Sequence, residues 1–346
     1  MAEQEKVRVA VLGASGYTGA ELVRLLLDHP HVELSYLSSE RHSGRPVSSV
    51  LAGVRNHPRA AGLRFRPLEA CDEVDVAFGC LPGGALPAQL PKLTERAGRI
   101  INLAGDFRLR DAAQAAVHYP ESASWTEPFR YFVPEFSASP VPERLLNLPG
   151  CMAVTTLYAL QPLFAAGLAT EDVVVDAKTG ASGGGSRSAE HPADRIGNFR
   201  VHKPYGHRHA PEITQALGDF AGTAPRLRFS TYSLDVARGI VVTAYGRLRP
   251  GVSAQDVKRA YGTAYARTPF VRFRGAARTP ADFPMLKSVV GSNVAEVAVS
   301  VEGDQYVAVA ALDNLIKGAS GQAVQALNTV YGFAPSLALP FTAVTP

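Results

Sequence analysis

A strand, a glycine-rich turn, a helix and a second strand follow one another in residues 7–39, and few folds begin in this way. Residues 7–12 read VRVAVL, an almost unbroken apolar run of strand length, which is typical of a strand buried on both faces of a parallel sheet. Gly13 ends this run, and AELVRLLLDH then has helical periodicity that stops at Pro30. VELSYLSS predicts the next strand, so the chain begins with a βαβ unit.

The alternation of strands and helices continues as far as residue 104. VDVAFGCL and RIINLA are two further apolar runs of strand length, and residues 87–97 between them fit a helix. Repeated strand and helix segments of this kind form an open parallel sheet with helices on both faces. We therefore predict an α/β fold with a doubly wound sheet of the Rossmann type.

Beyond Gly150 the pattern changes. A helix is predicted over residues 154–166, and the β-rich stretches RGIVVTAYGRL, NVAEVAVSVE and QYVAVAALDN follow with few helices between them, which indicates an α+β domain. We expect a Rossmann-type domain over residues 1–150 and an α+β domain, used for catalysis and oligomerisation, over residues 151–317. SGQAVQALNTVY predicts a last helix, and we expect residues 318–346 to return to the first domain.

Composition and charge exclude several classes of protein. The chain has 346 residues, 46% of them hydrophobic, and its formal charge of +4 is spread along the sequence, which argues against nucleic-acid binding. It has neither an apolar run of membrane-spanning length nor a signal-peptide core, so we expect a cytoplasmic protein that does not bind membranes. Three irregularly spaced cysteines suit neither a disulfide framework nor a zinc site, and no metal is expected.

The turn after the first strand reads GASGYTG, with the spacing G-x-x-G-x-x-G in place of the commoner G-x-G-x-x-G. Backbone N–H groups at the start of the following helix can meet a pyrophosphate, which predicts a dinucleotide site. A plain tight turn is the alternative. The candidate cofactor-binding residues are Gly13, Ser15, Gly16, Tyr17, Thr18 and Gly19.

The end of the second strand is where a dinucleotide fold distinguishes a ribose hydroxyl from a 2′-phosphate. The hydroxyls of Ser38 and Ser39 and the charge of Arg41 favour NADP(H). Glu40 could instead contact the free 2′-hydroxyl of NAD, so strict specificity stays open.

Cys151 follows the sequence NLPG and precedes the predicted helix. A thiol near a helix N-terminus gains thiolate character from the helix dipole, which makes Cys151 a candidate nucleophile. The alternative is a small buried hydrophobic residue, and this is the role that we expect for Cys71 and Cys80.

Two imidazoles and a carboxylate, from His207, His209 and Glu212, occur together in the polar segment GHRHAPE, which resembles neither a core strand nor an amphipathic helix. Such a segment favours a functional site, although residues two apart face opposite ways in an extended chain. Arg108 and Arg238 follow or begin predicted strands, where a guanidinium can bind phosphate or carboxylate or form an ordinary salt bridge. The Gly/Ser-rich residues 180–188 predict a flexible loop at the site.

Four separated motifs, GASGYTG, PGC, GHRHAPEI and DNLIKGASGQAVQALN, resemble in order and spacing the N-acetyl-γ-glutamyl-phosphate reductase family. The resemblance spans almost the whole chain. The family is similar to the aspartate-semialdehyde dehydrogenases and shares their two-domain plan. The resemblance implies an enzyme that uses NADPH to reduce an acyl phosphate to a semialdehyde in arginine biosynthesis, through a cysteine thioester and with release of phosphate.

The same resemblance implies roles for individual residues. Cys151 becomes the nucleophile, and His209 becomes the acid/base, with His207 as second choice. It also implies a homodimer or homotetramer. The remaining candidates are assigned to binding: Arg108, Arg238 and Glu212 to the substrate, and Asn314 to the nicotinamide end of the cofactor.

The sequence also departs from the usual family pattern. LPGCMAVT stands where the family commonly has NPGCYPT, and EHPADRIGNFRVHKPYGHRH resembles the sister reductases of lysine biosynthesis. Those enzymes act on an α-aminoadipyl phosphate held on a small acidic carrier protein, which the sequence pI near 9.0 would suit. Both substrates stay open, and two more distant alternatives are an aspartate-semialdehyde dehydrogenase-like enzyme and a non-catalytic dinucleotide sensor.

Overall fold

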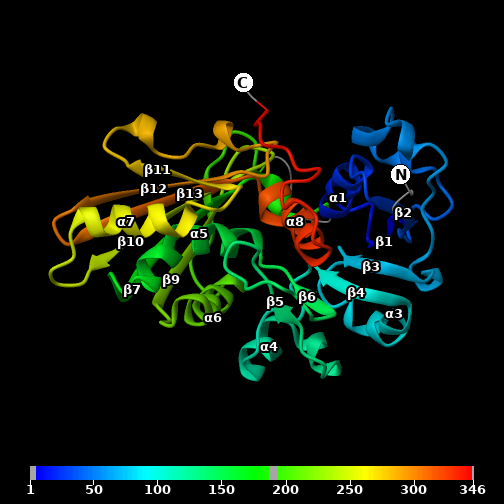
Figure 1. Cartoon of the computed structure of the whole chain (residues 1–346), viewed down its shortest axis with the longest axis horizontal. Helices are drawn as coiled ribbons and strands as arrows, with labels where there is room; N and C mark the ends of the chain where they lie inside the picture. Colours follow the sequence, from blue (N-terminus) through cyan, green and yellow to red (C-terminus); the bar gives the residue numbers. More distant parts are fainter. Residues whose placement is uncertain (1–4, 187–193, 345–346) are drawn as a thin grey trace. The chain divides into compact units, whose positions relative to one another are not determined.

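The computed structural model describes residues 5–186 and 194–344 (Figure 1). The chain forms two compact units. Unit 1 comprises Met1–Pro134, Ala138–Pro149 and Ala319–Leu339. Unit 2 comprises Glu135–Ser137, Gly150–Gly318 and Pro340–Pro346. None of the helices in the described ranges has both the length and the apolar character needed to cross a membrane.

Unit 1 is built on a six-stranded parallel sheet with the strand order β2-β1-β3-β4-β6-β5. The strands are β1 (Val7–Leu12), β2 (Val32–Leu37), β3 (Val74–Gly79), β4 (Ala97–Asn102), β5 (Arg130–Tyr131) and β6 (Leu145–Asn147). β1 lies between β2 and β3, and its apolar side chains are buried, as the VRVAVL pattern predicts. The predicted Rossmann-type sheet is confirmed.

Short helices and one returning helix accompany this sheet. They are α1 (Tyr17–Leu27), α2 (Val47–Val50), η1 (Ala52–Val54), η2 (Pro58–Ala60), η3 (Leu68–Ala70), η4 (Pro87–Gln89), α3 (Leu90–Arg96), α4 (Ala112–His118), η5 (Pro120–Ser124) and α8 (Gly321–Val330). The helix expected over residues 87–97 is split, because Pro91 at the start of α3 follows the 3-10 turn η4. α8 packs against α1, and Figure 1 shows the two side by side in red and blue.

Unit 2 contains a mixed seven-stranded sheet with the order β11-β12-β13-β10-β7-β9-β8, in which only the pairs β7–β9 and β11–β12 are parallel. Its strands are β7 (Ala169–Thr179), β8 (Arg200–Lys203), β9 (Arg226–Ser233), β10 (Ile240–Leu248), β11 (Val271–Ala276), β12 (Ala295–Glu302) and β13 (Gln305–Leu312). Its helices are α5 (Cys151–Ala165), η6 (Ala181–Gly184), α6 (His209–Ala221), α7 (Ala254–Tyr265), η8 (Pro280–Asp282) and η9 (Leu286–Ser288), and the π-helical turn η10 (Ile316–Ser320) leads on to α8. The predicted α+β architecture is confirmed.

Two boundaries differ from the sequence prediction. α5 begins at Cys151 and not at residue 154, because Gly150 has extended backbone angles and is the N-cap. The last residues do not stay with unit 1 after α8: the Asn293 N–H donates to the Pro340 carbonyl at 2.7 Å, and the Val344 N–H donates to the Val290 carbonyl at 2.7 Å. Residues 318–346 were expected to belong to the first domain as a whole, but the residues after Leu339 form backbone hydrogen bonds with unit 2.

A proline inside α5 leaves a carbonyl of that helix without its usual donor, and the neighbouring helix α7 supplies one. Pro162 has no N–H, so the helix cannot satisfy the Tyr158 carbonyl four residues earlier. The Tyr265 hydroxyl donates to that carbonyl at 2.6 Å, and the Tyr261 hydroxyl donates to the neighbouring Ala159 carbonyl. Two buried tyrosines of α7 therefore complete the hydrogen bonding of α5.

A Tyr265→Phe substitution should lower the free energy of unfolding by about 1–2 kcal/mol, because it leaves a buried carbonyl without its donor. Urea unfolding of the full chain measures the change. Tyr205→Phe, at a residue that is 81% exposed, is the control and should alter stability by less than about 0.5 kcal/mol. Equal stability of the Tyr265→Phe variant and the wild type would show that the carbonyl does not need the tyrosine.

Candidate functional site

The glycine turn of unit 1 has the geometry of a dinucleotide-binding loop. Gly13 has φ of +82°, and a Cβ on it would lie 2.5 Å from the Cys80 carbonyl oxygen. A Cβ on Gly19 would lie 2.4 Å from the Gly13 carbonyl oxygen, so α1 packs closely on the turn. Gly16 is the N-cap of α1 and has no side-chain cap, so the N–H groups of the first helical turn have no capping side chain. Such an end can receive a pyrophosphate.

The other candidate residues of the turn support its shape. Tyr17 begins α1 and is exposed, and the Thr18 carbonyl accepts a hydrogen bond from the Ser320 hydroxyl at 2.8 Å. Buried Ser38 accepts a hydrogen bond from the Gly13 N–H at 2.9 Å. Ser38 therefore holds the loop, a role that its place at the end of β2 did not predict.

The remaining residues after β2 differ in what their side chains contact. The hydroxyls of Ser39 and Ser15 lie 2.7 Å apart. The Glu40 carboxylate accepts a hydrogen bond from the Leu68 N–H at 2.6 Å, whereas the Arg41 side chain is exposed. One oxygen of Glu40, the carboxylate that could contact the ribose of NAD, thus binds a backbone amide.

Cys151 is the first residue of the fifteen-residue helix α5 in unit 2 and is partly exposed. This is the position at which the helix dipole favours a thiolate. A Cβ on Gly318, in the turn η10, would lie 2.9 Å from the Cys151 Cβ. The backbone of that turn therefore packs directly against the residue that carries the thiol.

The start of α6 packs on the residue before Cys151. A Cβ on Gly150 would lie 2.2 Å from Nε2 of His209, so the imidazole lies directly against the Gly150 backbone. The buried Glu212 carboxylate accepts a hydrogen bond from the Gly150 N–H at 2.7 Å. The structure thus brings Cys151, His209 and Glu212 together around one glycine.

His207 occupies a different position from His209. The chain is not extended between them: Arg208 has helical backbone angles, and α6 begins at His209. Nδ1 of His207 accepts the His209 N–H at 3.1 Å, and the two buried rings meet edge-on with centroids 4.7 Å apart. The two rings would face opposite ways only in an extended chain, and here the chain turns into a helix, so His207 supports the start of α6.

Arg108 is buried in unit 1 and contacts main-chain oxygens. Its Nε donates to the Leu148 carbonyl at 2.9 Å, and one terminal nitrogen donates to the Leu103 carbonyl at 2.8 Å. These bonds hold the segment that leads to Cys151. Substrate binding by Arg108 stays a prediction.

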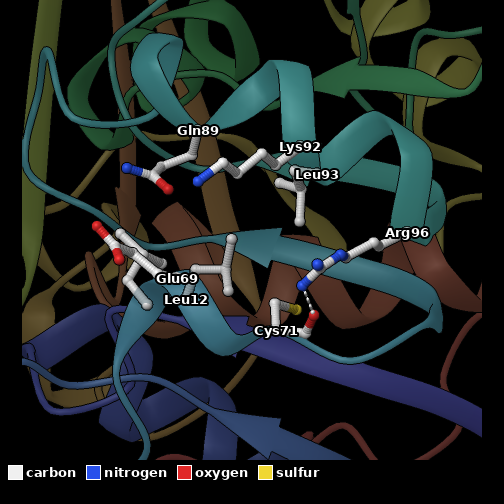
Figure 2. Close-up of a pocket in the computed structure, with 8 residues that line it drawn as sticks. Leu12, Glu69, Cys71, Gln89, Lys92, Leu93 and Arg96 are labelled. Atoms are coloured by element: carbon white, nitrogen blue, oxygen red, sulfur yellow. Dashed lines mark hydrogen bonds between the residues drawn. The ribbon is translucent and has the colours of Figure 1, made fainter.

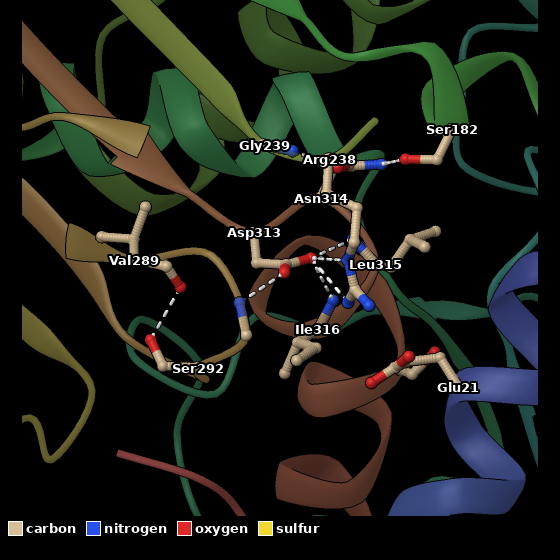
Figure 3. A network of polar contacts seen from close by, with 12 residues as sticks. Glu21, Ser182, Arg238, Gly239, Val289, Ser292, Asp313, Asn314, Leu315 and Ile316 are labelled. Carbon is tan, nitrogen blue, oxygen red and sulfur yellow. Dashed lines mark hydrogen bonds and ion pairs between the residues drawn. The ribbon is translucent and has the colours of Figure 1, made fainter. Parts of the chain in front are cut away.

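Arg238 and Asn314 take part in one polar network of unit 2 (Figure 3). Arg238 pairs with the buried Asp313 carboxylate at 3.0 Å and keeps a quarter of its side chain exposed. The Asn314 amide accepts the Gly239 N–H at 2.7 Å and donates to the Ser182 hydroxyl at 2.9 Å. Asp313 was not among the predicted site residues; its position directly after a buried strand was the available signal.

The Gly/Ser-rich run is described only as far as residue 186, and the rest of the predicted loop lies outside the described residues. Its described part includes η6, and backbone hydrogen bonds join it to the segment before β10: Ala181 N–H to Val236 O at 2.8 Å and Ser182 N–H to Ala237 O at 3.0 Å. These bonds hold this part of the run in place.

The other two cysteines have the properties of packing residues. Figure 2 shows Cys71 among the side chains of a small hollow of unit 1, where Arg96 donates to its carbonyl oxygen at 2.7 Å. Burial raises the pKa of the Cys71 thiol to about 11 and that of the Cys80 thiol to about 12. Neither is a thiolate near neutral pH. Among the described residues, no group of three His, Cys, Asp or Glu side chains could hold a metal ion.

Comparison with known proteins identifies the family. The model of the semialdehyde dehydrogenase NAD binding domain matches residues 8–142, and that of the semialdehyde dehydrogenase dimerisation domain matches residues 151–314. The chain belongs to the semialdehyde dehydrogenase family. The predicted nicotinamide dinucleotide cofactor is thereby confirmed for this member of the family.

Curated relatives of this semialdehyde dehydrogenase family member fall into two groups. It is 42% identical over 329 residues to N-acetyl-gamma-glutamyl-phosphate reductase 1 of Lactiplantibacillus plantarum, covering 94% of this chain and 95% of the relative. It is 38% identical over 357 residues to a protein of Thermomicrobium roseum named as a LysW-L-2-aminoadipate 6-phosphate reductase, covering 98% and 99%. Both groups are reductases of acyl phosphates, so the predicted family and enzyme class are confirmed.

Solved structures agree on the fold. Aspartate semialdehyde dehydrogenase II of Vibrio cholerae, complexed with ASA, aligns with a TM-score of 0.73 over 95% of this chain and 99% of that one, at 18% identity. At this identity the likeness supports the architecture alone. This likeness agrees with the two-domain plan that the family resemblance implies, which is shared with the aspartate-semialdehyde dehydrogenases.

A Gly19→Ala substitution should raise the dissociation constant for NADPH by about tenfold, because the new methyl group displaces α1 from the Gly13 turn. Titration of NADPH fluorescence measures the affinity. Gly53→Ala is the matched control, since a Cβ there has no neighbour within 4 Å and should leave the affinity unchanged. Unchanged affinity of the Gly19→Ala variant would refute the role assigned to this glycine.

Proposed function

We propose that this semialdehyde dehydrogenase family member uses NADPH to reduce N-acetyl-γ-glutamyl phosphate to its semialdehyde, with release of phosphate, in arginine biosynthesis. The observation that carries the proposal is the grouping of Cys151, His209 and Glu212 around Gly150. The 42% identity to an N-acetyl-gamma-glutamyl-phosphate reductase over nearly the whole chain supports this substrate.

In the first step the Cys151 thiolate attacks the acyl carbonyl carbon. The bond between the acyl carbon and the phosphate oxygen breaks, and phosphate leaves with the bonding electrons. A thioester of Cys151 remains. NADPH supplies the hydride that reduces the thioester carbon. Collapse of the resulting thiohemiacetal expels the Cys151 thiolate and releases the aldehyde.

His209 is the group best placed to move protons in this cycle. It lies against the residue before Cys151, at the start of α6. It would take the thiol proton before attack and stabilise the oxygen of the thiohemiacetal. Glu212 accepts the Gly150 N–H. We therefore propose that it keeps the Cys151 thiol and the His209 imidazole in position, and that this role is more important than binding the substrate.

The glycine turn of unit 1 fits the cofactor, since its close backbone contacts leave the start of α1 free of capping side chains. Arg41 supports NADP over NAD, because it is the exposed cation after β2, whereas Glu40 is engaged by the Leu68 amide. Asn314 is proposed to lie at the nicotinamide end.

Arg108 and Arg238 are proposed to bind the negative groups of the substrate. Arg238 fits this role better, because its guanidinium is partly exposed and Asp313 fixes its orientation. Arg108 is buried and binds backbone carbonyls, so its effect would come largely through the segment that precedes Cys151.

One surface of unit 2 favours a second substrate, the carrier-linked α-aminoadipyl phosphate. Residues 194–208 include β8, the edge strand of its sheet, and expose large hydrophobic side chains next to basic ones. Ile196, Phe199 and Tyr205 are 73%, 59% and 81% exposed, and the basic residues are Arg195, Arg200, Lys203 and Arg208. This surface would suit an acidic carrier protein that presents an α-aminoadipyl phosphate, as in the lysine branch.

We also infer that the chain forms a homodimer through unit 2, whose family model is a dimerisation domain. Helix α5 packs on β7, β10, β12 and β13. Val174 and Tyr245 are paired across β7 and β10 and are about two-fifths exposed. An exposed apolar pair in the middle of a sheet suits contact with a second copy.

The two substrates are separated by running the reaction in reverse. Phosphate-dependent reduction of NADP is measured with N-acetylglutamate semialdehyde and with the carrier-linked aminoadipate semialdehyde, and we expect the higher kcat/KM with the former. A higher value with the carrier-linked compound assigns the enzyme to lysine biosynthesis. Cys151→Ser should abolish activity with either one, and near-normal activity of that variant would exclude the thioester.

The two histidines should differ in their effect on rate. His209→Asn should lower kcat by about 10²–10⁴-fold if His209 is the acid/base. His207→Asn retains an acceptor for the His209 N–H and should lower kcat by less than about tenfold. Steady-state kinetics at one pH makes the comparison, and a large loss confined to His207→Asn would reverse the assignment.

A further inference from the structure

We propose that Lys317, through a buried ion pair with Glu135, is a positioning residue for the Cys151 thiol. The pair fixes the π-helical turn η10 against α5, the helix whose first residue is Cys151. The inference rests on the nucleophilic role proposed for Cys151. It gives a role to Lys317, which lies in the DNLIKG motif, and to Glu135, which lies in none of the four motifs.

The turn contacts Cys151 through Gly318. A Cβ on Gly318 would lie 2.9 Å from the Cys151 Cβ and 3.2 Å from Cδ1 of Leu312, so only glycine fits without a shift. No flexible side chain lies between the backbone of the turn and the base of the thiol. A small displacement of the turn therefore displaces the nucleophile directly. π-helical turns inside helices are frequent at functional sites.

Asp313 fixes the beginning of the turn (Figure 3). Its buried carboxylate accepts hydrogen bonds from the N–H groups of Leu315 at 2.9 Å and Ile316 at 3.1 Å. Its carbonyl accepts the Gly318 N–H at 2.9 Å. These bonds set where the turn starts, but they do not reach α5.

Lys317 joins the turn to α5. Its ammonium lies 2.6 Å from one oxygen of Glu135, and the other oxygen accepts the Tyr158 hydroxyl at 2.7 Å. The ammonium also lies 5.5 Å from the centre of the Tyr158 ring. Tyr158 is seven residues after Cys151 on the same helix, which is two helical turns. The ion pair therefore locks η10 onto the helix that carries the thiol.

The energetics favour a positioning role over a stabilising one. The side chains of Lys317 and Glu135 are 0% and 1% exposed, so both charges have lost their hydration. Burial lowers the pKa of Lys317, and the Glu135 carboxylate opposes this shift. Apolar pairs of similar size often do as well for stability. An apolar pair lacks the directional bond that holds η10 at a fixed distance from α5.

The test compares Lys317→Met with the double variant Glu135→Gln plus Lys317→Met in the full chain. The single variant leaves Glu135 without its cation and should lose both stability and activity. The double variant keeps an acceptor for Tyr158 and should recover thermal stability. Its kcat should nevertheless stay at least about tenfold below wild type with KM changed less than about threefold, because the thiol is misplaced and binding is intact.

A second readout does not require turnover. The rate of Cys151 alkylation by iodoacetamide, followed by mass spectrometry of its peptide, should change by at least about fivefold in the double variant and in Gly318→Ala. Lys178→Met, at a half-buried lysine of the same unit, is the matched control and should leave kcat and the alkylation rate unchanged.

Two outcomes would overturn the proposal: wild-type kcat in the stable double variant, or an unchanged alkylation rate. Failure of the thioester mechanism would be seen separately, as activity in Cys151→Ser. The alkylation experiment would still report whether Lys317 positions the thiol.

Discussion

The candidate site of unit 2 depends on the absence of a side chain at Gly150. Because this residue has no Cβ, the His209 imidazole and the N-terminus of α5 share a space that any other residue would fill. The Glu212 carboxylate then closes the contact by accepting the Gly150 amide. The thiol, the imidazole and the carboxylate are thus all positioned by the backbone of Gly150. The rest of unit 2 supports α5 and α6, the two helices that meet at this residue.

Backbone contact is the common principle of both units. In unit 1 the turn between β1 and α1 is set by Gly13 and Gly19, each of which has another backbone within van der Waals range of where a Cβ would be. In unit 2 the backbone of Gly318 likewise lies close to the Cβ of Cys151. The cofactor loop, the nucleophile and the supporting turn are therefore all placed by close packing against a glycine backbone, where a displacement of one element is transmitted to the next.

The sequence predicted those features that depend on local pattern. The βαβ start, the parallel sheet and the α+β second half follow from periodicity, and the motifs singled out Cys151 and His209, whose catalytic roles stay predictions. The orientation of His207 was not predictable, because it depends on a helix that begins two residues later. The pair Lys317–Glu135 joins residues 182 positions apart, and a lysine in a helical tail ordinarily indicates an exposed charge. Its apolar neighbours in NLIKGA were the only local sign of burial.

The placement of α8 has a consequence for synthesis of the chain. This helix packs against α1 in unit 1, and buried Val324 and Leu327 form part of its inner face, yet it is separated from the other parts of unit 1 by the whole of residues 150–318. On the ribosome the strands of unit 1 emerge first, but their partner helix is translated after every strand of unit 2. The side of α1 that contacts α8 therefore stays uncovered until nearly all of the polypeptide has been made, and apolar surface left open during synthesis favours aggregation.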